Sequence, residues 1–345
     1  MSLNSPTEEE ASLARQLAAP DKAARDRACQ SLVRYVKNVD GSDLDMLKFW
    51  KCLYYCLWLS DKAPIQHELA MSLSSLLHAC PNEAKAVQFL TAFYRTILRE
   101  WTHLDQYRVN KFYTLLRLVL RQVFHFLFQR DWPRELTNKM LDVLRTEVFE
   151  HTPNGPRLHY ADIYLAELLE VTKGALQTHH MVLLLTPMIE VLVASTDTAF
   201  KDRVAEKVLG AYTDRYAAER AVGVVENGGK KAAAAEVVVF AKVRTGAIQH
   251  MVFAAASDEG TQEGNRKRLY DIHKLFQKVS GEDFAKELEA SDGCDVKMKK
   301  KRRTSASASA SASSLDLSQG KEDDPVLTDQ SGKQSKKVKK GGRTT

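Results

Sequence analysis

The sequence predicts an all-α protein, and three observations support this fold class. Apolar residues recur at spacings of three and four along one segment after another, which is the period of a helix with one buried face. Proline and glycine are scarce before residue 220, and short polar turns separate the segments. Hydrophobic residues make up 44% of the 345 residues, close to the globular average. We therefore expect most of the chain to fold, as one large domain or two smaller ones.

The first three predicted helices span residues 21–36, 43–59 and 64–77. Asp21 precedes the first apolar stripe and is expected to be its N-cap. In the second helix apolar residues nearly surround the axis, so this helix should be buried on several sides. Ser60 and Asp61 end it, because a proline follows at a position that suits the first turn of the next helix.

The middle of the chain continues the same alternation of helix and turn. The apolar spacing and the turn residues predict five more helices, at 83–99, 104–129, 133–150, 158–171 and 181–194. Short turns between helices of this length produce sequential antiparallel pairs. Pairs of roughly 40 residues fit the period of a HEAT-like solenoid. No strict repeat is visible in the sequence, and a compact helical bundle is the alternative architecture.

The pattern changes towards the C-terminus. The segment VENGGKKAAAAE predicts a flexible insertion near 221–236. VVVF at 237–240 has strand propensity, but the residues from Ala241 to Ala256 have helical composition, and we interpret the stretch as helix. Residues 266–279 form a last amphipathic helix. From Ser291 the composition is of low complexity. We expect a helical domain over 1–290 and a disordered Lys/Ser-rich tail over 291–345.

The charge of the chain is concentrated in this tail. Residues 291–345 hold 13 Lys/Arg and 7 Asp/Glu, which leaves 37 of each in residues 1–290. A neutral body with a basic tail indicates a protein-docking domain with an electrostatic anchor or a nuclear address. A solubilising tail is the alternative, and phosphorylation of the serines between the basic clusters would cancel local charge. The predicted address consists of Lys297, Lys299, Lys300, Lys301, Arg302, Arg303, Lys336, Lys337, Lys339 and Lys340.

No pattern in the sequence points to catalysis, a cofactor or a membrane. Cys52 and Cys56 lie one helical turn apart but lack two further ligands at metal-site spacing, so we expect them in the core. His78 and Cys80 are expected at a helix end, without a third catalytic group nearby in sequence. An odd number of cysteines and a polar, acidic start argue against a disulfide framework and a secretory signal. No apolar run approaches the roughly 18 residues of a membrane span.

The four tryptophans fall within one stretch, from Trp50 through Trp58 and Trp101 to Trp132. Core packing between helices is the favoured interpretation, and a binding hot spot is the alternative. Basic residues interleave with aromatic residues next to the third tryptophan, a pattern that can bind RNA phosphates and bases. The opposing interpretation is an amphipathic helix with a solvated edge and an Asp105–Arg108 pair. The candidate RNA or partner contacts are Arg99, Trp101, Arg108, Lys111 and Tyr113.

Two long segments, LDMLKFWKCLYYCLWLSDKAPIQHELAMSLSSLLHA and FLTAFYRTILREWTHLDQYRVNKFYTLLRLVLRQVF, resemble the ribosomal RNA-processing protein 1 family. PNGPRLHYADIYLAELLEV continues the resemblance, DKAARDRACQSLVRYV and NRKRLYDIHKLFQKV match the two ends, and the segment near 221–236 departs from the pattern. The resemblance covers about residues 10–280. It implies a nucleolar HEAT-like solenoid, without catalytic activity, that is needed for processing the internal spacers of precursor ribosomal RNA in pre-60S particles. The implied partners are precursor rRNA and other large-subunit assembly factors.

Two other classes of function remain as alternatives. One is a nuclear solenoid adaptor for chromatin, a phosphatase or transport cargo. The other is a nuclease that acts on the spacer itself.

Overall fold

The computed structural model describes residues 12, 15–17, 19–38, 41–150, 153–226 and 239–280, all within a compact unit that comprises Met1–Asp295. These residues are almost entirely helical and contain no strand, so the all-α prediction is confirmed. None of the described helices is long and apolar enough to cross a membrane. The helices are α2 (Lys22–Asn38), α3 (Asp43–Leu59), α4 (Ala63–Ser75), α5 (Glu83–Trp101), α6 (Val109–Phe128), α7 (Arg134–Val143), α8 (Asn154–Thr172), α9 (Thr178–Ala194), α10 (Thr198–Val204), α11 (Ala211–Glu226), α12 (Thr245–Ser257) and α13 (Glu263–Ser280).

Three short segments extend these helices. A 3₁₀ turn, η1 (Leu76–Ala79), follows α4, whereas two π-helical turns, η2 (Leu144–Phe149) and η3 (Ala205–Gly210), follow α7 and α10.

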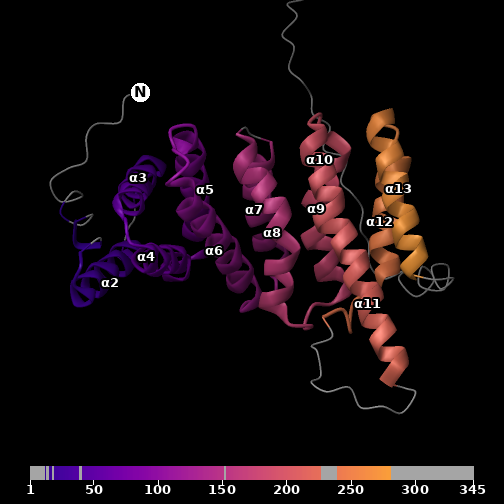
Figure 1. The fold of residues 1–345 in the computed structure, drawn as a ribbon, viewed down its shortest axis with the longest axis horizontal. Helices are drawn as coiled ribbons and strands as arrows, with labels where there is room; N and C mark the ends of the chain where they lie inside the picture. Colours follow the sequence, from indigo (N-terminus) through magenta and orange to yellow (C-terminus); the bar gives the residue numbers. More distant parts are fainter. Residues whose placement is uncertain are drawn as a thin grey trace, which may run out of the picture. The chain divides into compact units, whose positions relative to one another are not determined.

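The helices form two layers in which each helix packs mainly on the next helix of its own layer (Figure 1). One layer runs α3, α5, α7, α9, α12. The other runs α2, α4 with η1, α6, α8, α10 with η3, and then α13. Stacking of successive antiparallel pairs produces this alternation, so the solenoid prediction is confirmed.

Local sequence explains where several helices begin. The Asp21 carboxylate accepts hydrogen bonds from the amides of Ala23 and Ala24, as expected for an N-cap. Ser42 and Asp45 form a capping box at the start of α3. The Asn82 side chain caps α5 by accepting from the Lys85 amide.

Aromatic side chains join one helix pair to the next. Trp50 is fully buried between Phe89 and Phe93, with ring centroids 4.9 and 4.7 Å away, and its Nε1 donates to the Phe89 carbonyl at 3.0 Å. Tyr54 of α3 stacks on Phe112 of α6 at 4.7 Å. Burial of each such ring contributes about 1.5–3 kcal/mol, which makes these contacts a main source of cohesion between repeats.

A buried hydroxyl pair adds directionality to this packing. Tyr160 of α8 donates to the Leu116 carbonyl of α6 at 3.2 Å, and its oxygen lies 2.9 Å from the hydroxyl of Tyr94 in α5. Both tyrosines are fully buried. Since an unpaired buried hydroxyl is costly, this contact favours one register of the three helices.

The structure corrects three predicted boundaries. Helix α6 begins at Val109 instead of 104, because Asp105 accepts from the amides of Tyr107 and Arg108 and holds 102–108 as turns. The helix predicted through 241–256 begins at Thr245, after turns at 239–242. The helix predicted over 133–150 changes to a π-turn from Leu144 onward.

The region between 195 and 226 contains two helices, α10 and α11, that the sequence did not delimit. Helix α11 continues through Glu226, so the first residues of the predicted flexible insertion are helical. Its remainder and the whole predicted tail lie outside the described residues, and the domain boundary near 290 stays a prediction.

Candidate interaction edges

A buried lysine closes the end of α3. Lys111 lies in the first turn of α6 and is only 7% exposed. Its Nζ donates to the carbonyls of Trp58 at 2.7 Å and Ser60 at 2.8 Å, which are among the groups that a helix C-terminus leaves unpaired. Burial lowers the pKa of Lys111 below its ordinary value. Lys111 is therefore an internal cap in this structure, with its ammonium turned away from any RNA at the surface.

Arg108 lies one turn before Lys111 and remains at the surface. Its guanidinium covers the ring of Trp58 at 4.0 Å and pairs with the Asp105 carboxylate. The predicted Asp105–Arg108 pair is thus confirmed. Next to these residues, Tyr107 is 83% exposed and Leu59 is 54% exposed. We name Trp58, Leu59, Tyr107 and Arg108 the α3–α6 patch.

The remaining predicted contacts divide between the interior and the surface. Trp101 is buried and meets the ring of Tyr113 edge-on at 5.1 Å. Tyr113 is half-buried and lies 4.6 Å from the ring of His159. Arg99 is exposed and pairs with Glu100 at 3.0 Å. The structure brings Trp101 and Tyr113 together as packing residues, whereas only Arg99 and Arg108 present cations to solvent.

Sequence reasoning missed the exposed members of the α3–α6 patch. Tyr107 and Leu59 stand at the ends of helices, where no periodic pattern distinguishes an outward from an inward side chain. Position directly before a turn was the one available signal, since turn residues lie at the surface.

The thiol and imidazole groups considered in the sequence are part of the core. Cys52 and Cys56 are buried, as expected, and their contact and burial raise the pKa of Cys56. Burial raises the pKa of Cys80 to about 12, which disfavours a thiolate nucleophile. His78 binds the side chain of Gln122 at 2.8 Å, and burial lowers its pKa. No group of three potential metal ligands occurs among the described residues.

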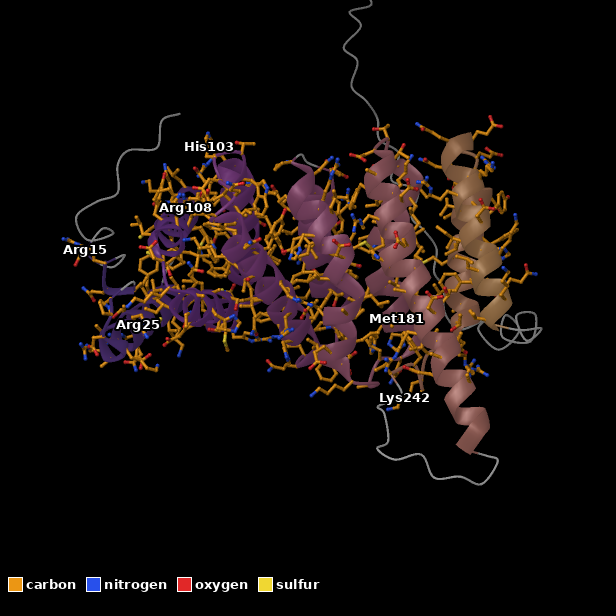
Figure 2. All side chains as sticks on the ribbon, in the orientation of Figure 1. Arg15, Arg25, His103, Arg108, Met181 and Lys242 are labelled. Carbon is orange, nitrogen blue, oxygen red and sulfur yellow. The ribbon has the colours of Figure 1, made fainter. Side chains whose placement is uncertain are left out.

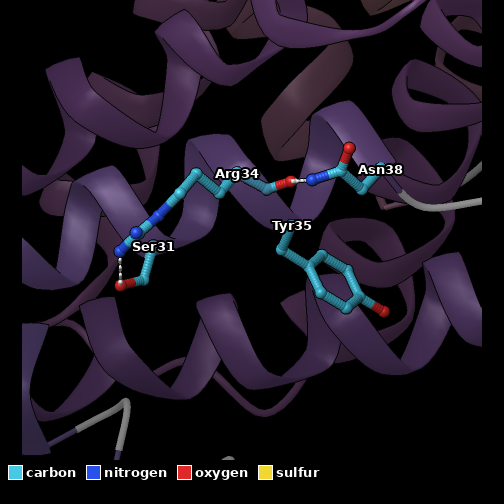
Figure 3. A pocket seen from close by; sticks show the side chains of 4 residues that line it. All are labelled: Ser31, Arg34, Tyr35 and Asn38. Carbon is cyan, nitrogen blue, oxygen red and sulfur yellow. Dashed lines mark hydrogen bonds between the residues drawn. The ribbon is translucent and has the colours of Figure 1, made fainter.

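A shallow depression lies on the surface of α2 (Figure 3). Its lining includes Arg34, which donates to the Ser31 hydroxyl at 3.2 Å, and Tyr35, which stacks on Phe49 at 4.8 Å. Asn38 completes the lining and donates to the Arg34 carbonyl. The depression is formed by one face of a single helix and is open to solvent, unlike the enclosing pockets that hold small ligands.

Comparison with known proteins identifies the family. The family model described as nucleolar protein Nop52 matches residues 8–301, which is most of the chain. The chain is 35% identical over 215 residues to ribosomal RNA processing protein 1 homolog B of Homo sapiens, covering 60% of this chain and 28% of that protein. It is 32% identical over 208 residues to homolog A of Homo sapiens, covering 58% and 45%. It is 28% identical over 297 residues to the homolog of Dictyostelium discoideum, covering 77% and 58%.

The matched region spans less than two thirds of the length of each of these three relatives. It coincides with the stacked helices described above, and the family match includes every described helix from α2 to α13. The resemblance found in the sequence is therefore confirmed: the chain belongs to the Nop52 family, whose curated members are named ribosomal RNA processing protein 1 homologs.

Proposed function

We propose that the protein is a nucleolar assembly factor of pre-60S ribosomal particles, needed for precursor rRNA processing at the internal spacers. The observation that carries this proposal is the family match over residues 8–301, together with relatives named for ribosomal RNA processing. Its partners would be precursor rRNA and other large-subunit assembly factors. We assign no catalytic activity and no cofactor to the protein.

The two-layer stack supports a scaffold role. Helices of successive repeats lie side by side, so the turns between them form long edges along which several partners can bind at once. Buried aromatic rings hold each repeat against the next, as at Trp50 and Tyr54. A surface of this kind positions partners relative to one another.

The α3–α6 patch is the proposed protein-contact surface of the scaffold. Trp, Tyr and Arg are the residue types enriched at binding hot spots. Here Arg108 is already paired with Asp105, and Arg99 with Glu100, so the patch carries little unbalanced charge. Tyr107 and Leu59 supply exposed apolar area that a partner would bury. RNA contact by Arg99 and Arg108 stays a prediction.

The basic tail is the proposed nuclear and nucleolar address. The clusters at 297–303 and 336–340 hold the Lys and Arg residues that such an address requires. Deleting Ser291–Thr345 should weaken nucleolar accumulation and non-specific RNA binding without lowering the melting temperature of the helical body. Loss of the body's cooperative thermal transition would contradict the proposed boundary.

Density-gradient sedimentation of nuclear extract tests the function. The tagged full chain should travel with large precursor particles, and its depletion should cause spacer-containing precursor rRNA to accumulate. Sedimentation as a small complex, or with chromatin, would instead favour the adaptor function. Cleavage of naked spacer RNA by purified protein, abolished by one substitution, would contradict the assignment of no catalytic activity.

A further inference from the structure

One edge of the helix stack gathers the N-termini of three adjacent helices. Helices α7, α9 and α12 follow one another in the same layer, and each packs on the next. Their first residues are Arg134, Thr178 and Thr245. In Figure 1 the starts of α7 and α9 lie on the lower side of the stack, where α6 and α8 end. Helix axes pack about 8–10 Å apart, so the three N-termini extend over about 20 Å.

Direct contacts between the turns make this edge continuous. The ring of Trp132, before α7, lies 6.1 Å from the ring of His180 in the first turn of α9. The Thr178 hydroxyl, at the start of α9, accepts from the Arg244 amide at 2.9 Å and lies 3.4 Å from the Lys242 carbonyl. Figure 2 labels Met181, next to His180, and Lys242 near this lower side.

The three N-termini lack side-chain caps. The N-cap residues of α7, α9 and α12 are Pro133, Gln177 and Arg244, and none caps its helix through its side chain. The two preceding helices of the same layer do have caps, from Ser42 and Asn82. Amides in the first turns of α7, α9 and α12 are therefore available to an external acceptor.

Cations stand where the helix dipole disfavours them. Arg134 is the first residue of α7, His179 the second of α9, and Arg244 the N-cap of α12, with Lys242 two residues earlier. Arg134, Lys242 and Arg244 are exposed and form no ion pair within the described residues. Positive charge at a helix N-terminus costs stability unless an anion is present. The acids nearby are Asp131, which is exposed, and Glu135, which pairs with Lys139.

A buried polar atom at the same edge is without a partner. His180 is only 8% exposed, and its Nδ1 makes no hydrogen bond. The ring lies 3.9 Å from that of His179, which is exposed at the first turn of α9. Native proteins rarely leave a buried polar side-chain atom unpaired, so this atom is an independent sign of a missing ligand.

We propose that this edge, formed by the N-terminal turns of α7, α9 and α12, binds the phosphate backbone of single-stranded RNA. A row of three amide clusters and three unpaired cations over about 20 Å suits a polyanion better than one small anion. The RNA identity of that polyanion rests on the function proposed above. The sequence prediction placed RNA near Arg108 and Lys111, at the turn between α5 and α6.

Salt-dependent binding of the full chain tests this edge. The triple variant Arg134→Gln, Lys242→Gln, Arg244→Gln is compared with the matched variant Lys51→Gln, Lys62→Gln, Lys267→Gln, which removes the same charge elsewhere. The probe is a fluorescent 20-nucleotide oligouridylate. Loss of three phosphate contacts should reduce the slope of log K against log salt by about 2 units, since each contact to a single strand contributes about 0.7. Equal slopes for the two variants, with unchanged melting temperatures, would overturn the proposal.

Two further measurements separate the possible outcomes. The ¹⁵N resonance of His180 Nδ1 should shift when oligouridylate is added to the wild-type chain, and an unchanged resonance would count against the edge. Polyglutamate serves as a second polyanion: if the triple variant lost only polyglutamate binding, the edge would belong to an acidic protein. Particle association of the wild-type chain with unaltered RNA binding by the variant would refute this edge alone and leave the proposed function intact.

Discussion

Replacing Lys111 by Met should destabilise the first repeats by about 2–4 kcal/mol. The side chain donates two hydrogen bonds, to the carbonyls of Trp58 and Ser60, at 2.7 and 2.8 Å. Hydrogen bonds from charged groups contribute about 1.5–3 kcal/mol each, and desolvation of the ammonium offsets part of that sum. Methionine has a similar length and fills the same space, so the loss reports on the two unpaired carbonyls.

Urea unfolding of the full chain, followed by tryptophan fluorescence, measures this loss. Lys62→Met is the matched control, because Lys62 is exposed and should change the unfolding free energy by less than about 0.5 kcal/mol. A loss below about 1 kcal/mol for Lys111→Met would refute its role as a cap. Reduced RNA binding by a variant of normal stability would instead favour the contact that the sequence predicted.

Three further results follow from the packing and the titrating groups. Gly155→Ala should lose about 1–3 kcal/mol, because its Cβ would lie 2.8 Å from Trp101 Nε1, whereas Gly264→Ala, with open space around it, should be neutral or stabilising by up to about 1 kcal/mol in thermal melts. Phe112→Ala should lose about 3–5 kcal/mol in urea unfolding, and a loss below about 1 kcal/mol would contradict a core position. Burial lowers the pKa of His159 below 6.5, so the unfolded state binds the proton first and stability falls as pH drops from that value towards the folded-state pKa. His159→Gln should flatten this dependence in unfolding measured from pH 7 to 5, and an unchanged slope would contradict the assignment.

The fold could be predicted because its dominant signal is local. Helical periodicity and short turns were sufficient to identify α2 to α9 and their pairing. Errors arose where short-range polar contacts override periodicity. Residues 104–108 carry apolar and aromatic side chains at helical spacing, but the Asp105 carboxylate binds two amides and stops the helix from starting. Competition of this kind between a side chain and the helical backbone is weakly encoded in a hydrophobic pattern.

Lys111 illustrates why the candidate contacts could not be assigned in the same way. In the sequence it stands among Arg108, Phe112 and Tyr113, and a cation among aromatics is compatible with either a surface or a buried position. Its carbonyl partner Ser60 is 51 residues away, so only the packing of α6 against the end of α3 decides the outcome. Exposure depends on such long-range contacts, whereas helix formation does not.

Comparable long-range caps recur along the stack and help to specify how the repeats dock. Asn265 of α13 donates to the carbonyls of Val193 and Ser195 at the end of α9, while Lys201 donates to the Asn265 side chain. Each of these polar groups would be buried without a partner if its neighbour docked in another register, at a cost of about 1–3 kcal/mol. Apolar stripes alone would tolerate sliding of one repeat against the next. The buried caps therefore favour the fixed arrangement of edges that a scaffold needs.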